Sequence, residues 1–319
     1  MKTIIVGGTG FLGYHAGLEF LQRGHQVTAL GLPPLPLDEG YLKKIDVVKL
    51  TFETATDAEI LIAMGGQETL VFAAGADDRV TPKKPAYPFF HYHNVEVVER
   101  ILHLAKKAGI KRAIVLGSYF VHFNRIWSER KLADYHPYIR SRVEQEQVCL
   151  NLSSETFQIM VLELPYIFGS MEGRVPLWKP LVNMARTGTA YFCSGGTNCV
   201  SVKSVAEAIV GAAEKGDGGK AYLIGDENLS WEQMFQGFGR GLRKKVKVIT
   251  LPKFVLQVVM LGIALQRWIK GIEGGLDPIQ YVDIQIENTF FDPTSSQLVL
   301  GYSRGDLEQA FKDTVNACS

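Results

Sequence analysis

Three side chains in the middle of the chain have types and spacing suited to proton transfer at an oxygen. Tyr138 and Arg142 are four residues apart, so on a helix they project from one face, one turn from each other. A cation at that distance favours the tyrosinate and lowers the pKa of a phenol from its reference value of about 10. Ser118 follows an apolar run and could hydrogen-bond the same substrate oxygen. The three residues predict acid/base chemistry on a hydroxyl or carbonyl group.

A glycine-rich turn near the start of the chain has the pattern of a dinucleotide site. Gly7, Gly10 and Gly13 lie in GGTGFLG, between an apolar run and a helix-like segment. The first glycine permits the tight turn, the second lets the backbone approach a pyrophosphate, and the third lets helix and strand pack closely. The helix N-terminus then offers free N–H groups to the phosphates. A turn without a ligand is the alternative, which the strand before it and the helix after it disfavour.

The end of the second expected strand bears on the choice of cofactor. An acidic residue about 20 positions after the glycines binds the adenosine ribose of NAD, but Leu30 and Gly31 stand there. A small neutral residue leaves room for a 2′-phosphate, although no arginine stands beside it. We therefore expect NADP or NAD, with a slight preference for NADP.

The motifs together resemble the extended and atypical short-chain dehydrogenases, which include NAD(P)-dependent sugar epimerases, dehydratases and 3β-hydroxysteroid dehydrogenases. The resemblance covers most of the chain and rests on GGTGFLG, on FAAGA at Phe72 to Ala76, on Asn94, on VLGS at Val115 to Ser118 and on PYIRSRVEQE at Pro137 to Glu146. It implies Tyr-based catalysis with hydride transfer on a secondary alcohol or ketone, such as a nucleotide sugar or a steroid-like substrate, and assigns catalysis to Ser118, Tyr138 and Arg142. The cofactor contacts that it implies are Gly7, Thr9, Gly10, Phe11, Leu12, Gly13, Gly31, Ala73, Ala74, Gly75, Asn94, Tyr138, Arg142, Pro165 and Ile167.

The chain departs from the family pattern at several places. Arg142 replaces the usual lysine, Glu163 stands in LELPYIFG where an arginine is common, and Thr51 and Phe52 replace a Gly-Asp pair. Arginine keeps the charge and can bond ribose hydroxyls, but it cannot give up a proton. We therefore expect electrostatic activation of Tyr138 without a proton relay through residue 142. An NAD(P)-binding sensor or interaction protein without turnover is the alternative of a different class.

Short β-rich runs alternate with helix-length segments, which predicts an α/β, Rossmann-like, doubly wound parallel sheet with a smaller C-terminal substrate domain. Glycine and proline become denser after Pro165, so we place the NAD(P)-binding domain at 1–165 and the substrate-binding domain at 166–319, with 198–225 packing back on the first. The expected strands are Thr3–Val6, Gln26–Leu30, Asp46–Leu50, Thr69–Ala73, Arg112–Leu116, Phe157–Leu162 and Ala221–Ile224. The expected helices are Phe11–Arg23, Phe89–Lys107, one opened by a capping box at Ser230 and Gln233, and Ser303–Val315.

The apolar segment Phe254–Leu265 is too short to span a bilayer. We interpret it as a packed or lid helix in preference to a peripheral membrane contact, because interfacial helices usually carry one strongly basic face.

Composition narrows the range of partners. The 319 residues include 34 basic and 33 acidic side chains, so an extended nucleic-acid surface is not expected. The spacing of the four cysteines suits neither zinc nor a redox pair, and His91 and His93 lie on different faces of a helix, so no metal is expected.

His122 could line the substrate pocket. We expect a cytoplasmic protein with reduced thiols, a small-molecule substrate and no nucleic-acid or membrane partner, with a homodimer as a candidate oligomeric state. The four cysteines are Cys149, Cys193, Cys199 and Cys318.

Overall fold

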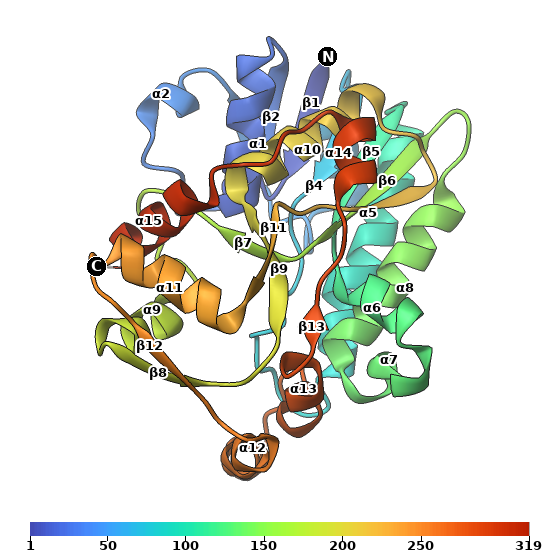
Figure 1. Ribbon diagram of the computed structural model, residues 1–319. Coiled ribbons are helices and arrows are strands. Elements are labelled where there is room, and N and C mark those ends of the chain that lie inside the picture. The colour runs from blue at the N-terminus through green and yellow to red at the C-terminus, as the bar shows by residue number, and fades with distance from the viewer. Residues whose placement is uncertain (319) are drawn as a thin grey trace.

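A seven-stranded parallel sheet lies at the centre of the molecule. The computed structural model describes residues 1–318, and its main sheet has the order β10-β6-β5-β4-β1-β2-β3 (Figure 1). The strands are β1 (Lys2–Val6), β2 (Gln26–Leu30), β3 (Asp46–Val48), β4 (Thr69–Phe72), β5 (Arg112–Ser118), β6 (Gln158–Leu164) and β10 (Lys220–Leu223). In register, Val6 pairs with Leu30 on one side and with Phe72 on the other. All the carboxyl ends therefore meet at one edge of the sheet, where ligands of such folds bind.

Apolar runs form these strands because both faces of the sheet are covered. The predicted α/β parallel architecture is confirmed, and six of its strands differ from prediction only at their ends. The largest extension is at β5 and β6, which pair without interruption from Arg112 with Gln158 to Ser118 with Leu164. This pairing carries Ser118 to the edge of the sheet as the last residue of its strand.

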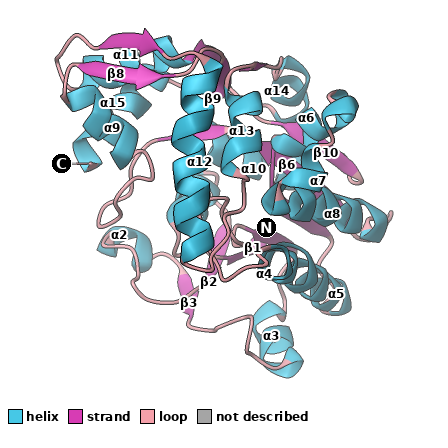
Figure 2. Cartoon of the chain, turned by 90° about the horizontal axis from the view of Figure 1, so that it is seen from below, coloured by secondary structure: helices cyan, strands magenta, loops and turns pink. Residues whose placement is uncertain are grey.

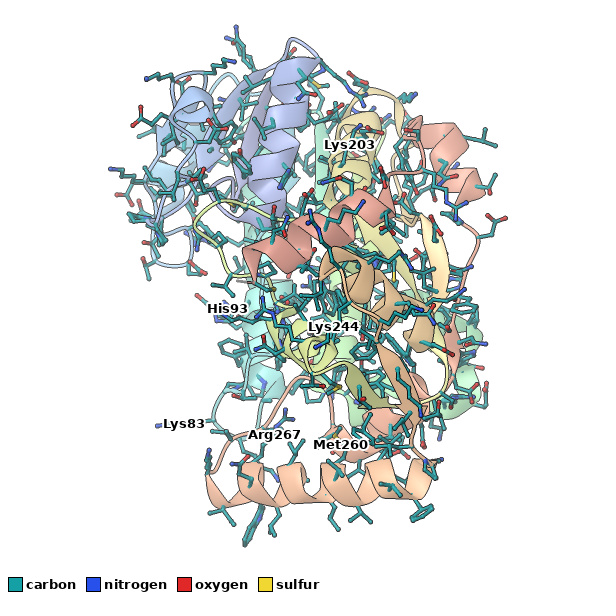
Figure 3. All side chains as sticks on the ribbon, turned by 60° about the vertical axis from the view of Figure 1, so that its left-hand side comes forward. Lys83, His93, Lys203, Lys244, Met260 and Arg267 are labelled. Atoms are coloured by element: carbon teal, nitrogen blue, oxygen red, sulfur yellow. The ribbon has the colours of Figure 1, made fainter. Side chains whose placement is uncertain are left out.

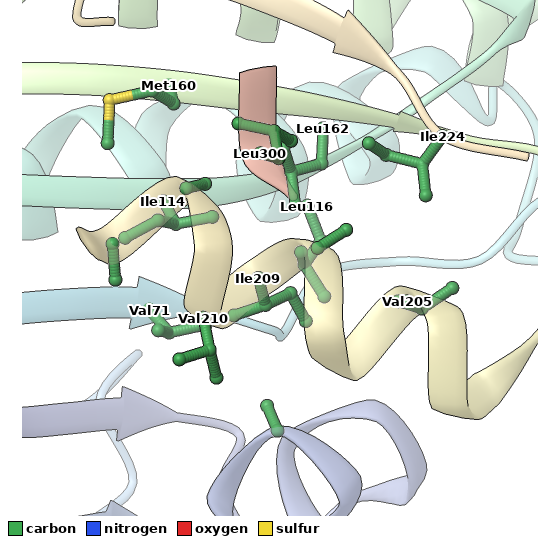
Figure 4. Packing of buried hydrophobic residues seen from close by; sticks show 14 of the residues in the cluster. Val71, Ile114, Leu116, Met160, Leu162, Val205, Ile209, Val210, Ile224 and Leu300 are labelled. Atoms are coloured by element: carbon green, nitrogen blue, oxygen red, sulfur yellow. The ribbon is translucent and has the colours of Figure 1, made fainter. Parts of the chain in front are cut away.

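One face of the sheet is covered by α1 (Phe11–Gln22), α10 (Val202–Lys215) and α14 (Thr294–Leu300). Helix α10 packs on α1 and lays three apolar side chains, Val205, Ile209 and Val210, against the strands (Figure 4). The strand residues labelled beneath them are Val71, Ile114, Leu116, Met160 and Leu162. This cluster joins a late segment of the chain to the first βαβ unit.

The opposite face is covered by α3 (Asp57–Met64), α5 (Val97–Lys107) and α8 (Pro137–Leu152). The helix predicted over Phe89–Lys107 consists of three parts, because α4 (Tyr87–His91) continues through a π-helical turn at Tyr92–Glu96 into α5. It also begins two residues early, since Pro88 is accepted in the first turn of a helix. Such π turns are frequent at functional sites, and this one contains Asn94.

The second half of the chain builds smaller layers around its own core. In a four-stranded sheet β9 pairs with β7, β11 and β13, while β8 pairs with β12. These strands are β7 (Tyr166–Phe168), β8 (Thr189–Phe192), β9 (Gly196–Ser201), β11 (Glu227–Ser230), β12 (Lys247–Thr250) and β13 (Asn288–Thr289). The remaining helices are α2 (Glu39–Leu42), α6 (Phe120–Ile126), α7 (Leu132–Tyr135), α9 (Lys179–Arg186), α11 (Trp231–Gly241), α12 (Lys253–Ile269), α13 (Pro278–Gln285) and α15 (Leu307–Ala317).

Two helix starts can be compared with prediction. The capping box at Ser230 and Gln233 opens α11, as predicted. The last helix begins at Leu307 and not at Ser303, because the Asp306 side chain accepts the N–H of Gln309 and caps it there.

Helix α12, predicted as a packed or lid helix, packs by one side only. It extends over Lys253–Ile269 and, within the described residues 1–318, has no buried residue along its length. Seen from below, it crosses in front of the rest of the chain as one long helix (Figure 2). Across residues 1–318, every helix falls short of the length and hydrophobicity that a membrane crossing requires.

Candidate active site

The glycine turn between β1 and α1 has the geometry of a phosphate cradle. Gly7 has a φ of +82°, and its N–H donates to the Leu30 carbonyl at 2.8 Å. A Cβ on Gly13 would lie 2.3 Å from the Gly7 oxygen, so only glycine lets the helix approach. A Cβ on Gly10 would meet the Gly7 oxygen at 3.3 Å and no other described atom within 4 Å. The turn is therefore tight toward the protein and open on the side where α1 presents its first N–H groups.

Gly31 at the end of β2 is also fixed by packing. A Cβ there would lie 2.4 Å from the Thr9 hydroxyl oxygen, and that hydroxyl donates to the Leu32 carbonyl at 3.2 Å. The ribose-binding acid found at this strand end in many dinucleotide sites therefore has no room here. Gly31 and Thr9 line neither of the two cavities at the carboxyl edge of the sheet. Both residues shape the glycine turn.

A cavity of about 450 Å³ lies at the carboxyl edge of the sheet. Ser118 reaches it from the end of β5, while Tyr138 and Arg142 reach it from the first two turns of α8. The Arg142 guanidinium carbon lies 5.1 Å from the centre of the Tyr138 ring, which places the cation over the phenol. The structure thus brings together the three residues to which catalysis was assigned.

The pKa of Tyr138 corrects one expectation. Burial raises this pKa above its usual value, since the charged form loses its hydration. The positive charge of Arg142 and a hydrogen bond from Ser118 lower the pKa, but less than burial raises it, and the charge of Asp78 raises it further. The phenol is therefore held neutral, and the expected lowering below 10 is wrong for the chain as described.

Arg142 is anchored to the backbone of β5 and of the loop that follows β4. Its guanidinium donates to the Leu116 carbonyl and the Ala76 carbonyl, each at 3.2 Å, and to the Gln145 side chain at 2.9 Å. Its buried Nε has no hydrogen-bond partner among residues 1–318. An open phosphate cradle and an unpaired donor beside Tyr138 together fit a dinucleotide lying along the sheet edge.

Asn94 takes a structural place beside the cavity. It is fully buried in the π turn, its Oδ1 accepts the Ala76 N–H at 2.8 Å, and its Nδ2 donates to the Ser141 hydroxyl and the Ala76 carbonyl. Both amide donors are thereby used within the protein. Asn94 joins the loop after β4 to α8 and does not line the cavity.

The other predicted cofactor residues divide into two groups. Those that line the main cavity are Leu12, Ala73, Ala74, Gly75, Tyr138, Arg142, Pro165 and Ile167. Gly10, Phe11 and Ile167 line a second hollow of about 290 Å³ on the diphosphate side, together with Arg174. His122 is absent from the lining of both cavities among the described residues and packs on Phe123 and Phe291 instead.

Much of the wall comes from residues that sequence reasoning missed. The aromatic ones are Tyr119, Phe120, Tyr166, Trp178 and Tyr281. Tyr281, with Gln285, comes from α13, more than 130 residues from Tyr138, and no local pattern marks it. The hydroxyl groups of Tyr166 and Tyr281 hydrogen-bond to each other at 2.8 Å. This pairing satisfies two buried hydroxyls and leaves flat rings toward the cavity.

A charged loop follows β4 and could have been found from its position at a strand end. Asp77 and Arg79 form an ion pair with an Nη2 to Oδ2 distance of 2.6 Å. Between them lies Asp78, whose pKa is raised to about 7 by burial and by the neighbouring charge of Asp77. All three residues line the main cavity.

Comparisons with known proteins agree with this arrangement. A family model described as "NAD dependent epimerase/dehydratase family" matches residues 3–225. A "4-hydroxy-2-methyl-3-oxo-4-farnesyl-3,4-dihydroquinoline-1-oxide ketoreductase" of Stigmatella aurantiaca is 25% identical over 71% of this chain and 68% of its own. A "putative dihydroflavonol 4-reductase" of a Synechocystis strain is 22% identical over 98% of this chain and 93% of its own.

Solved structures share the fold over the full length of the chain. The crystal structure of gox2253 has a TM-score of 0.79 at 20% identity and covers 99% of this chain and 97% of its own. The UDP-glucuronic acid 4-epimerase of Bacillus cereus, crystallised with NAD, has a TM-score of 0.69 at 12% identity, covering 100% and 98%. These likenesses concern the fold.

Proposed function

The chain belongs to the NAD dependent epimerase/dehydratase family and is an NAD-dependent enzyme; from this premise we propose that it interconverts a ketone and a secondary alcohol on a cyclic, largely apolar substrate. One observation carries the proposal. The hydroxyl groups of Ser118 and Tyr138 face a cavity whose substrate side is mostly aromatic. Such a wall binds flat apolar rings and supplies few polar partners for a sugar.

The roles follow from the positions of the side chains. Tyr138 donates its phenolic proton to the substrate oxygen as the ketone becomes an alcohol, and takes a proton back in the reverse direction. Ser118 hydrogen-bonds the same oxygen and fixes its orientation. Arg142 stabilises the tyrosinate through its charge without exchanging a proton. Bound NAD(P)H supplies the hydride, or NAD(P)⁺ accepts it.

The cofactor would lie along the carboxyl edge of the sheet. The turn from Gly7 to Gly13 would hold its diphosphate, and the segment Ala73–Gly75 with Ile167 would flank the nicotinamide half. The absence of an acid at Gly31 supports the slight preference for NADP over NAD.

Nucleotide sugars are the second candidate substrates. Arg79 lies between the two cavities and lines both, so it could pair with a diphosphate. It is already bound to Asp77, however, and breaking that pair would weaken binding of a diphosphate. The ketone is therefore favoured, in line with the two reductases among the relatives.

The Tyr138→Phe variant tests the mechanism. Removing the only hydroxyl in the proposed proton-donating position should lower kcat by roughly 10²–10⁴-fold and leave NADPH affinity within a few-fold. The assay follows NADPH or NADH absorbance with a panel of bicyclic and steroid ketones and, separately, UDP-glucose. Tyr135→Phe, an exposed tyrosine on the preceding helix, is the matched control. Wild-type turnover by Tyr138→Phe would show that Tyr138 is not the proton donor.

A further inference from the structure

Helix α12 presents a continuous apolar stripe to the outside. Phe254, Val258, Leu261, Leu265 and Trp268 are spaced by four, three, four and three residues, so they align along one face of the helix. Their exposed fractions are 67%, 67%, 57%, 55% and 70%. We call these five residues the α12 stripe. A stripe of this length on an exposed helix marks an interaction site and is not explained by ordinary surface composition.

Most of the surface of the stripe is exposed, although Leu261, Leu265 and Trp268 also border a hollow of about 340 Å³ between α12 and the body of the molecule. Figure 3 shows α12 as a rod at one end of the molecule, with Met260 and Arg267 on the side toward the body and other side chains projecting into open space. Met260 and Arg267 are half-buried, in contrast to the stripe. The body side contacts α13, so the helix is fixed in place by one face and free on the other.

Charges of both signs lie around α12, but they are distributed unevenly. Lys253, at its start, pairs with Asp283 at 2.7 Å, and Glu273 and Asp277 line a hollow beside Leu261 and Leu265. From Lys253 to Lys270 the chain contains three basic residues and no acidic one. The loop that carries Lys83 and Lys84 reaches the end of the helix, where the Lys84 N–H donates to the Gly271 carbonyl at 3.0 Å. Among residues 1–318, no carboxylate lies within salt-bridge distance of the exposed side chains of Lys83, Lys84 or Lys270. Unpaired cations therefore border the apolar stripe at one end.

We propose that α12 lies in the surface of an anionic lipid bilayer, with the stripe among the acyl chains and Lys83, Lys84 and Lys270 at the headgroups. Interfacial helices combine Trp, Phe and Leu on one face with Lys and Arg beside it, and aromatic residues are enriched at the headgroup level. A second copy of the chain fits less well. Parallel pairing would place the unpaired Lys270 of each copy opposite the other, whereas Lys253, at the opposite end of the helix, is already paired with Asp283 at 2.7 Å. This inference replaces the expectation of no membrane partner.

The position of α12 connects the bilayer to the cavity. The chain leaves the helix through Gly274 and Gly275, and the Gly275 carbonyl accepts the N–H of Tyr138 at 2.9 Å. It then enters α13, which contributes Tyr281 to the cavity wall. An apolar ketone dissolved in the bilayer would therefore have a short way to the cavity. That consequence rests on the proposed function, whereas the docking itself does not.

Vesicle co-sedimentation of the full chain, without substrate or cofactor, tests the docking. The probes are vesicles of phosphatidylglycerol and phosphatidylcholine, and vesicles of phosphatidylcholine alone. Wild type should sediment with the anionic vesicles. The Leu261→Glu/Leu265→Glu variant should bind at least tenfold less, and Lys83→Gln/Lys84→Gln should lose about fivefold for each lysine removed. The control, Ile62→Glu/Leu298→Glu, alters two residues that are 81% and 78% exposed on other helices and should bind like wild type.

The outcomes separate the possible occupants of the stripe. Wild type that stays in the supernatant, or binds neutral vesicles equally well, overturns the proposal. So does a stripe variant that binds like wild type while retaining the wild-type melting temperature. Light scattering that shows a wild-type dimer in solution, converted to monomer by Leu261→Glu/Leu265→Glu, would assign the stripe to a second copy of the chain. Because the assay contains no substrate, failure of the docking and failure of the proposed reaction can be told apart.

Discussion

At the scale of single residues, the central question is how arginine serves where related enzymes use lysine. The planar guanidinium of Arg142 satisfies the carbonyl groups of Leu116 and Ala76 while its carbon lies 5.1 Å from the Tyr138 ring centre. A lysine ammonium is a single point of charge and could not span both carbonyls in this way. Arg142 therefore supplies a fixed positive charge under the phenol, and any proton that Tyr138 loses must be replaced by another route.

The raised pKa of Tyr138 affects the two directions of the reaction differently. Burial holds the phenol neutral at physiological pH, which is the form that donates a proton to a ketone. Oxidation of an alcohol needs the tyrosinate, and this form is costly in the buried site. In the proposed mechanism, the raised pKa therefore hinders alcohol oxidation and leaves the protonated phenol available for ketone reduction.

Asp78 should shift the pH dependence of the oxidation. Its pKa is raised to about 7, and above that pH its negative charge raises the pKa of Tyr138. In Asp78→Asn no charge forms, so the pKa of Tyr138 is lower and the tyrosinate is available at lower pH. The rising limb of log kcat against pH for alcohol oxidation should move down by roughly half to one pH unit. The same profile for Asp134→Asn, an exposed carboxylate on α7, should coincide with that of wild type. An unchanged limb in Asp78→Asn would mean that the two groups are not coupled.

At the scale of elements, the glycine turn allows a matched pair of substitutions. Gly10 has a φ of −88°, which any residue can adopt, and a Cβ there would meet only the Gly7 carbonyl oxygen, at 3.3 Å, so that a shift of a few tenths of an ångström makes room for a methyl group. Gly10→Ala should therefore fold normally and lose at least tenfold in NADPH affinity, because its methyl group would occupy the place of the diphosphate. Gly13→Ala should destabilise the fold by roughly 2–4 kcal/mol, since its methyl group would meet the Gly7 backbone.

Thermal unfolding and NADPH fluorescence titration distinguish these two effects. If Gly10→Ala bound NADPH as wild type does, the diphosphate would not lie on this turn. If Gly13→Ala melted at the wild-type temperature, the close approach of α1 to the strand would not limit the fold.

Elements with a strong local pattern could be predicted, and those fixed by distant contacts could not. All seven strands of the central sheet follow from their apolar runs, and α11 follows from the capping box at Ser230. The π turn at Tyr92–Glu96 could not be predicted, because it depends on the bonds that Asn94 makes to Ala76 and Ser141. The exposed side of α12 could not be predicted either, because the sequence does not state what lies beside its apolar residues.

At the scale of the whole molecule, the two sides of the main cavity differ in how well the sequence predicts them. The side with Ser118, Tyr138 and Arg142 could be predicted, and the aromatic side could not. Ser118, Tyr138 and Arg142 follow from spacing, since a strand end and a helix turn bring them together. Tyr281 and Trp178 reach the same cavity from elements whose placement is set by tertiary packing, and neither has a motif. The residues of the substrate wall could therefore be identified only from the structure, whereas the glycine turn could be located from its sequence.

Arg174, from the second half of the chain, contacts two loops of the first half. One of its terminal nitrogens donates to the Pro34 carbonyl at 2.8 Å and lies 3.5 Å from the Thr9 carbonyl. The side chain lines the hollow beside Gly10, where it could also pair with a phosphate.

We expect Arg174→Ala to change the response to cofactor more than the fold itself. Without cofactor, the loss of a half-exposed hydrogen bond should lower the free energy of unfolding by about 0.5–1.5 kcal/mol. For a chain of this length, that loss lowers Tm by roughly one or two degrees. With NADPH at about 100 times its dissociation constant, wild type should gain about 2.7 kcal/mol, or roughly 4 °C. The variant should gain clearly less at the same concentration, because its affinity is lower. Differential scanning fluorimetry over a range of NADPH concentrations measures both the stability without cofactor and the gain with cofactor.

The control is Arg304→Ala, which removes an exposed arginine paired with Glu227 and should show the full wild-type gain. An equal gain in Arg174→Ala would show that Arg174 holds the two halves together by its bonds to the protein alone and leaves the diphosphate to the glycine turn.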